Sequence, residues 1–220
     1  MTATAPSGRN VAQLALPLGW DSDDDSGGFL VGTSNVEAVR HLEHHATWPV
    51  RASVLVGPAG SGKSLLGRAF AQATGGAVID PVEGTPDHAI FHAWNAAQET
   101  RKPLLLIASA PPASWPVALP DLRSRLMAAP VVIIGEPDDC LALTLIERQF
   151  AARATPVAPD LAGYLVPRIE RSYSAIHRVV RALDEAALAG HRRIGIRTAR
   201  EVLFAHDLLG TARRRTKDTS

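Results

Sequence analysis

The residues that decide the fold are 52–76, which read ASVLVGPAGSGKSLLGRAFAQATGG. The apolar run at 52–56 is typical of a buried strand, and the pattern from about residue 62 to 73 predicts a helix closed by Gly75 and Gly76. Between them, every fixed position of the phosphate-binding pattern G-x-x-x-x-G-K-[ST] is satisfied. The residues of this loop are Gly57, Pro58, Ala59, Gly60, Ser61, Gly62, Lys63 and Ser64. The sequence therefore predicts a phosphate-binding loop between a strand and a helix, in preference to an ordinary glycine-rich turn.

The residue types in and near this loop suit a nucleoside triphosphate with Mg²⁺. Its backbone amides and the following helix N-terminus would point at the β-phosphate, Lys63 would reach the β- and γ-oxygens, and Ser64 would ligate Mg²⁺. A further acidic contact to Mg²⁺ is expected after a neighbouring strand, where Asp80 is the best candidate. Pro81 follows it and cannot orient an attacking water, so we expect weak intrinsic hydrolysis. Glu83 is the alternative for that role, although the proline and glycine around it favour a turn.

Strands and helices alternate on both sides of this loop. Further strands are predicted at 77–80, 103–109 and 131–136, and helices within 34–48 and 86–100. Beyond Pro137 the pattern indicates helices only, at roughly 138–152, 158–170, 172–189 and 197–208. We therefore predict an α/β fold with a mostly parallel sheet flanked by helices, followed by an all-helical subdomain.

Composition divides the chain into four predicted parts. They are a tether at 1–28, an α/β nucleotide-binding base at 29–137, a helical lid at 138–210 and a basic tail at 211–220. Residues 1–150 hold ten lysines and arginines against fifteen acidic residues, whereas residues 151–220 hold thirteen against seven. Apolar residues make up 46% of the chain without a run of membrane-spanning length, and there is one cysteine. We expect a cytoplasmic protein.

Two kinds of residue that often bind metals or react are interpreted as ordinary ones. The histidines at 41, 44, 45, 88 and 92 have helical spacing, but no cysteine or carboxylate cluster supports a metal site. We interpret them as surface histidines. Cys140 has no evident activating neighbour in the sequence, so we expect a buried, unreactive thiol.

Several motifs together resemble the AAA+ ATPases of the bacterial replication-initiator group, and in particular the Hda-type regulators related to DnaA. The motifs are QLALPL at 13–18, FLVGTSN at 29–35, the phosphate-binding loop, IFHAWN at 90–95, LPDLRSRL at 119–126 and RIERSYSAIHRVVRALDEAAL at 168–188. The resemblance covers nearly the whole chain, and it implies ATP or ADP, with Mg²⁺, as the cofactor. Only fifteen residues separate Ser64 from Asp80, so the AAA+ sheet is expected to lack one strand–helix unit.

The segment QLALPL resembles the peptide by which that family binds the DNA sliding clamp, the β subunit of DNA polymerase III. Pro17 forces Leu16 out of the α region, which makes the segment extended. Leu14, Leu16 and Leu18 can then fill a groove, while the Gln13 amide pairs with partner backbone. The alternative is a strand that folds back on the chain's own sheet.

The segment LPDLRSRL resembles the family's arginine-finger motif, with Arg125 at the finger position. Such an arginine stabilises charge on the γ-phosphate bound by a neighbouring subunit, here implied to be DnaA. Two alternatives remain open from the sequence. Arg125 can form an ion pair with Asp121 at helical spacing, and Arg123 can take the finger role instead.

The resemblance also assigns residues around the nucleotide. The base pocket is implied at Leu30, Val31 and Gly32, while Asn35 can be only a helix cap. Ser109 matches a polar residue that senses the γ-phosphate. The position of the family's nucleotide-sensing arginine falls on Ser174, with Arg171 and Arg178 one turn to either side. Together with Pro81, this favours a protein that holds nucleotide, ADP among the candidates, as a conformational support.

These expectations combine into one leading hypothesis. The chain is expected to bind adenine nucleotide, dock on the sliding clamp and stimulate ATP hydrolysis by DnaA, without sequence-specific DNA binding; self-association is left open. The alternatives are a small phosphate-loop kinase and an ATPase similar to helicase loaders.

Overall fold

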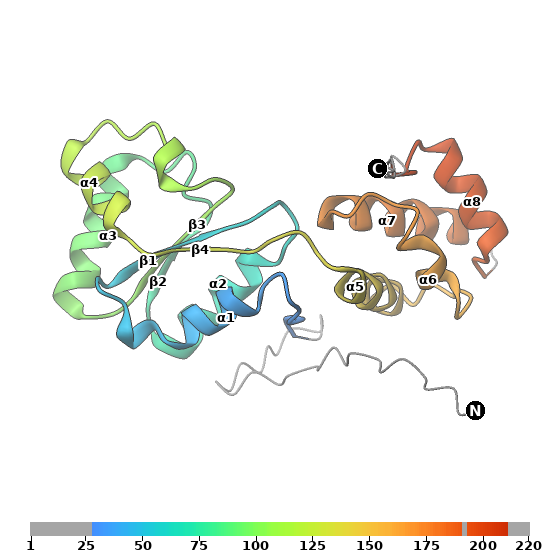
Figure 1. Cartoon of the computed structure of the whole chain (residues 1–220), viewed down its shortest axis with the longest axis horizontal. Helices are drawn as coiled ribbons and strands as arrows, with labels where there is room; N and C mark the ends of the chain where they lie inside the picture. The colour runs from blue at the N-terminus through green and yellow to red at the C-terminus, as the bar shows by residue number, and fades with distance from the viewer. Residues whose placement is uncertain (1–27, 191–192, 211–220) are drawn as a thin grey trace, which may run out of the picture.

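A computed structural model describes residues 28–190 and 193–210 of the chain. Its first part alternates strands and helices (Figure 1): α1 (Val36–Glu43), the 3-10 helix η1 (His45–Thr47), β1 (Ala52–Val56), α2 (Lys63–Thr74), β2 (Ala77–Ile79), α3 (Asp87–Thr100), β3 (Leu104–Ala108), the 3-10 helix η2 (Pro112–Ser114), α4 (Pro120–Ala128) and β4 (Val131–Ile133). Its second part holds only helices: α5 (Asp139–Ala152), α6 (Leu161–Leu165), α7 (Tyr173–Gly190) and α8 (Ile196–Ala205). Strand–helix alternation thus gives way to helices after β4.

The four described strands form one parallel sheet in the order β2-β3-β1-β4. All residues of the two central strands, β1 and β3, are buried, which is why both read as continuous apolar runs. The edge strands β2 and β4 have three residues each and are partly exposed. This arrangement confirms the predicted parallel sheet, trimmed to four strands, with an all-helical part after it.

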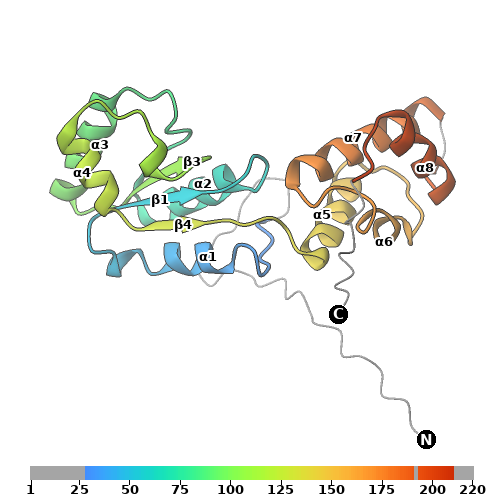
Figure 2. The same ribbon diagram turned by 45° about the horizontal axis from the view of Figure 1, so that its top comes forward.

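Helices cover both faces of the sheet (Figure 2). On one face, alternate residues of β1 and β3, such as Val54 and Leu106, pack with Trp94 of α3 and Leu122 of α4. On the other face, Leu55 and Ile107 pack with buried side chains of α1 and α2. The period-two alternation of the strands therefore divides the base into two apolar layers.

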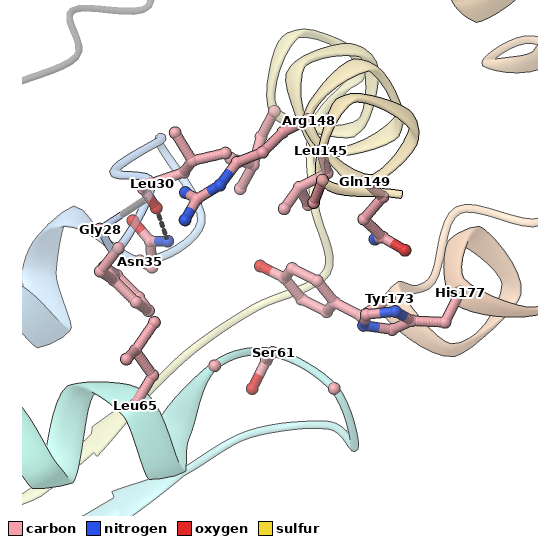
Figure 3. A pocket seen from close by; sticks show the side chains of 15 residues that line it. Gly28, Leu30, Asn35, Ser61, Leu65, Leu145, Arg148, Gln149, Tyr173 and His177 are labelled. Carbon is pink, nitrogen blue, oxygen red and sulfur yellow. Dashed lines mark hydrogen bonds between the residues drawn. The ribbon is translucent and has the colours of Figure 1, made fainter. Parts of the chain in front are cut away.

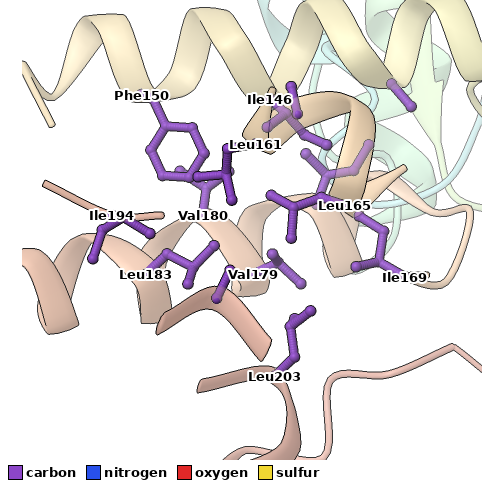
Figure 4. Packing of buried hydrophobic residues seen from close by; sticks show 14 of the residues in the cluster. Ile146, Phe150, Leu161, Leu165, Ile169, Val179, Val180, Leu183, Ile194 and Leu203 are labelled. Carbon is purple, nitrogen blue, oxygen red and sulfur yellow. The ribbon is translucent and has the colours of Figure 1, made fainter. Parts of the chain in front are cut away.

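The helices after β4 have a separate core (Figure 4). Ile146 and Phe150 of α5 pack against Val180 and Leu183 of α7, and Leu203 of α8 is buried in the same cluster. A single parallel bridge between Val157 and Ile194 ties the loops of this part together. The lid helices therefore form a second body beside the sheet, as Figures 1 and 2 show.

Two interpretations of single residues are corrected. Cys140 is exposed, because it lies in the first turn of α5 on the side away from the lid core. His41 is not a surface histidine, because its ring stacks on Trp48 at 5.0 Å and its Nε2 lies 2.7 Å from Ser53 Oγ, on a fully buried strand residue. Trp48 itself is buried.

Candidate functional site

The phosphate-binding loop connects the end of β1 to the start of α2. Gly60 and Gly62 have φ angles of 78° and 85°, in the left-handed region that favours glycine. α2 begins at Lys63, so its first free backbone amides face the space enclosed by the loop. A Cβ added at Gly62 would lie 2.8 Å from Phe29 Cε2, so the ring of Phe29 leaves no room for a side chain there. The loop has the glycine positions and helix terminus that a phosphate requires.

The Lys63 ammonium lies inside this loop. Its Nζ donates hydrogen bonds to the carbonyls of Gly57, at 2.6 Å, and Pro58, at 2.8 Å. Burial lowers the pKa of Lys63, while the nearby carboxylates of Asp80 and Glu83 oppose that shift. A cation therefore stands at the loop beside two carboxylates, and phosphate oxygens would compete with the carbonyls for it.

The carboxyl ends of β2 and β3 bring Asp80, Glu83 and Ser109 to the same edge of the sheet. The backbone NH and the hydroxyl of Ser109 both donate to Glu83 Oε1, at 2.5 and 2.6 Å. Partial burial raises the pKa of Glu83, but these hydrogen bonds outweigh it and hold the pKa below its ordinary value. The backbone amide of Gly57 donates to the carbonyl of Ala108 at 3.3 Å, so the phosphate loop and Ser109 are neighbours.

The turn expected around Glu83 is present, because the Thr85 amide donates to the Val82 carbonyl at 3.1 Å, yet Glu83 still lies at the site. Pro81 follows Asp80 as expected, but the chain then returns to β3 because the Val82 amide donates to the Ile107 carbonyl at 2.9 Å. That bond places Glu83 beside Ser109 instead of directing it away from the site. Asp80 and Ser64, the two expected contacts to Mg²⁺, are both exposed, at the end of β2 and in the first turn of α2.

A cavity of about 250 Å³ lies beside the phosphate loop, between the base and the lid helices (Figure 3). Its walls are mostly apolar, which suits the nucleoside part of a nucleotide. The lining residues are Gly28, Phe29, Leu30, Asn35, Gly60, Ser61, Gly62, Leu65, Leu141, Leu145, Arg148, Gln149, Ala152, Tyr173 and His177. The buried hydroxyl of Ser61 has no hydrogen-bond partner among the described residues.

The segment before α1 contributes one wall, but only in part as expected. Leu30 lines the cavity, whereas Val31 packs against the core and Gly32 lies against Leu141 of the lid. Asn35 does more than precede the helix. Its side chain donates to the Leu30 carbonyl and accepts from the Gly32 amide, each at 2.8 Å, so it fixes the backbone of this wall.

The lid closes the cavity with α5 and α7. His177 and Tyr173 of α7 cover the phosphate loop, since a Cβ added at Gly60 would lie 3.0 Å from His177 Cδ2 and 3.4 Å from Tyr173 Cβ. Tyr173 Oη lies 3.3 Å from Ser34 Oγ, a direct contact between lid and base. Ser174, the expected position of the sensing residue, does not line the cavity.

The two arginines expected near Ser174 are held elsewhere. Arg171 pairs with Asp139, and Arg178 lies 3.8 Å from Glu170. The cavity instead receives Arg148 and Gln149 of α5, which the sequence analysis did not identify. A signal for them exists, because residues 141, 145, 148, 149 and 152 have the spacing of one helix face.

Arg125 lies on α4, at the end of the base away from the lid in Figures 1 and 2. Its guanidinium pairs with Asp121 at 2.8 Å, donates to Asn95 Oδ1 at 2.7 Å and lies 4.8 Å from the ring centre of Phe91. The Arg125 side chain is nevertheless 32% exposed. Arg123 is exposed, and its side chain has no hydrogen bond or ion pair within residues 28–190 and 193–210.

The expected clamp-binding residues, Gln13, Leu14, Leu16, Pro17 and Leu18, lie outside the described residues. In the described part of the chain, none of the helices combines the length and the apolar character needed to cross a bilayer.

Of the comparisons with known proteins, those with solved structures bear on the fold. No protein-family model matches the chain. A Haemophilus influenzae protein described as uncharacterized is 28% identical over 116 residues. The aligned region covers 52% of this chain and 50% of that protein, so the chain spans about half the length of the relative. Domain III of the Thermotoga maritima replication initiation protein DnaA aligns with a TM-score of 0.68 and 12% identity, covering 83% of this chain and 95% of that one. AMPPCP-bound DnaA from Aquifex aeolicus aligns with a TM-score of 0.53 and 18% identity, covering 70% of this chain and 62% of that one.

The fold and the site together define a class. The chain has an AAA+ fold with a phosphate-binding loop, a trimmed parallel sheet and a helical lid. Within that class, its architecture is similar to that of the DnaA replication initiator.

Proposed function

We propose that this protein is a regulator of chromosome replication initiation that binds adenine nucleotide, docks on the DNA sliding clamp and stimulates ATP hydrolysis by DnaA. The observation that carries the proposal is the separation of two sites on one AAA+ fold. The phosphate-binding loop and the cavity proposed for nucleotide lie between sheet and lid, while α4 with Arg123 and Arg125 lies at the opposite end of the base, where it could meet another protein's nucleotide.

The residues present fit a nucleotide with Mg²⁺. The loop amides and Lys63 would hold the phosphates, Ser64 and Asp80 would hold Mg²⁺ with its water shell, and the apolar cavity would receive the adenosine. A bound Mg²⁺ would neutralise charge on the phosphates. The AMPPCP-bound Aquifex aeolicus DnaA supports this assignment, because an ATP analogue binds that protein on a similar fold.

We expect slow hydrolysis at this site. The residue after Asp80 is a proline, and the Glu83 carboxylate that lies nearby accepts two hydrogen bonds from Ser109. A carboxylate that is held in this way is a weaker base for an attacking water, because those bonds lower its pKa. The bound nucleotide would therefore act mainly on the position of the lid.

Hydrolysis in the partner would depend on an arginine of α4. The contacts of Arg125 with Asp121, Asn95 and Phe91 orient its guanidinium and leave part of it exposed. The γ-phosphate of ATP bound to DnaA would meet an oriented positive charge when it approaches α4. Stabilisation of the negative charge on that phosphate is the contribution of an arginine finger. Arg123, two residues earlier and exposed, is the second candidate for this role.

A test measures ATP hydrolysis by DnaA with DNA-loaded clamp and this protein. We expect acceleration that Arg125→Ala and Arg125→Lys both remove, since lysine lacks the planar donor set. Arg200→Ala, an exposed arginine of α8, is the matched control and should retain the acceleration. Loss with Arg123→Ala but not with Arg125→Ala would move the finger role to Arg123. Full acceleration by both variants would reject the α4 site.

Docking on the clamp is tested separately. The double variant Gln13→Ala/Leu16→Ala should lose capture by purified clamp in a pull-down, whereas Arg9→Ala, in the same segment but outside the motif, should keep it. Equal capture of all three chains would reject QLALPL as the docking segment, and it would leave the nucleotide site unaffected.

A further inference from the structure

One cation in the cavity wall, Arg148, has no charge partner among the residues that the structure describes. Arg148 extends from α5 toward the segment at Leu30 and Asn35, and so spans the gap between lid and base (Figure 3). Its side chain has no ion pair and no hydrogen bond within residues 28–190 and 193–210. Burial lowers the pKa of Arg148. A partly buried guanidinium of this kind gains from a ligand that offers acceptor atoms or an aromatic face.

The neighbouring lid arginines are already satisfied. Arg153 lies 4.0 Å from Asp184, Arg171 pairs with Asp139, and Arg178 lies 3.8 Å from Glu170. The residues of α7 that cover the phosphate loop are Tyr173 and His177, neither of which carries a guanidinium. Among the described residues that line the cavity, Arg148 is therefore the arginine available to a ligand.

We propose that Arg148 is the residue through which the lid contacts the bound nucleotide, and that it binds the nucleoside end, so the lid responds equally to ATP and ADP. This inference rests on the proposed nucleotide site. The phosphates of a bound nucleotide would lie at Gly60 to Lys63, whereas Arg148 lies across the cavity beside Leu30 and Asn35. At that end its plane can stack on the base, and its N–H groups can donate to the base edge or the ribose hydroxyls.

Two features of α5 support a contact that moves the lid. Gln149, the next residue, also lines the cavity, and its buried Oε1 has no hydrogen-bond partner in the described part of the chain. In addition, α5 is the first lid helix after β4 and packs on α7 through Phe150 and Val180. A ligand held by Arg148 would therefore fix the position of α5, and with it the lid core to which α5 contributes.

The test is isothermal titration of the full chain and its variants with Mg-ATP, Mg-ADP and AMP. Arg148→Ala should lower the affinities for ATP and ADP by the same factor, about tenfold, and should also lower the affinity for AMP. Arg148→Lys should not restore affinity, because an ammonium lacks the plane that stacks on a base. Arg171→Ala, whose partner is Asp139, is the matched control and should bind as the unmodified chain does. Thermal unfolding without nucleotide confirms that each variant is folded.

Two results would overturn the inference while leaving the nucleotide site intact. One is unchanged affinity in Arg148→Ala when Lys63→Ala abolishes ATP binding. The other is a loss for ATP much larger than that for ADP, which would make Arg148 a γ-phosphate sensor. If the unmodified chain bound none of the three nucleotides, the proposed function and this inference would fail together.

Discussion

Gly62, the last residue of the phosphate-binding loop before α2, has a φ of 85°, and the ring of Phe29 fills the space where a Cβ would lie. Backbone conformation and packing therefore both require glycine. At the residue scale, the site depends on such single positions, where one atom more or one charge fewer changes what the loop can bind.

Gly62→Ala should destabilise the fold by about 1–3 kcal/mol, because alanine is strained at positive φ and its Cβ would collide with Phe29. Chemical denaturation measures the change. Gly84→Ala is the matched control for φ alone, since Gly84 has a φ of 84° and open space around its Cα. The difference between the two variants should isolate the clash, and Phe29→Ala should relieve it in the Gly62→Ala background. Equal losses would show that Phe29 contributes nothing.

His41 gives stability a dependence on pH. Burial against Trp48 lowers the pKa of His41 below its ordinary value, so the folded chain binds this proton less readily than the unfolded chain does. Stability should therefore be full above about pH 6.5 and decrease as the pH falls through the folded pKa. Denaturation at several pH values measures this effect. The loss of stability between about pH 6.5 and lower pH should be smaller in His41→Gln than in the unmodified chain, and an equal loss would contradict it.

At the scale of elements, the junction between β4 and α5 depends on Asp138. This residue is the N-cap of α5, accepting from the Leu141 amide at 2.7 Å, and it also accepts from the hydroxyl of Thr33 in the base. Burial raises the pKa of Asp138, but these hydrogen bonds outweigh it and hold the pKa below its ordinary value. One carboxylate therefore both begins the first lid helix and ties it to the base.

Asp138→Ala should destabilise the chain by about 1–2 kcal/mol, the usual range for a lost N-cap. Asp138→Asn keeps an acceptor for the helix and should cost less. Thr33→Val removes only the contact with the base. If Asp138→Ala costs no more than Thr33→Val in urea denaturation, capping of α5 contributes nothing measurable.

The sequence predicted some elements more accurately than others, for physical reasons. β1 and β3 are buried on both faces, so their apolar runs mark them clearly. The run at 158–170 predicted one long helix, but α6 has only five residues, Leu161–Leu165, because residues 166–168, with Pro167 in the middle, form a turn after it. The short helix packs on α5 and α8. Arg148 was missed because a charged residue in an amphipathic helix is normally solvated, and only the docked lid makes it a cavity residue. Glu83 depends on a long-range bond between Val82 and Ile107 that local sequence does not encode.

At the scale of the whole molecule, two apolar cores stand side by side. The base core is formed by both faces of the sheet, and the lid core is formed by α5 to α8. Phe150 is 2% exposed and packs in the lid core, so its substitution tests the stability of the lid.

Phe150→Ala should cost about 3–5 kcal/mol of lid stability through lost burial and the cavity left behind. Hydrogen exchange should then accelerate in α5 and α7 while β1 and β3 keep their protection. Trp94→Ala, a buried aromatic residue of the base, should show the opposite pattern. Uniform acceleration in both variants would mean that the two bodies unfold as one unit.

The cavity has walls from both bodies, so anything that fills it touches the sheet side and the helical side at once. A small molecule bound there would link the base to the lid. It stabilises only those arrangements in which both halves are folded and closed, by an amount that grows with the logarithm of its concentration. Folding of the base and of the lid would therefore both be favoured as the concentration of such a ligand rises.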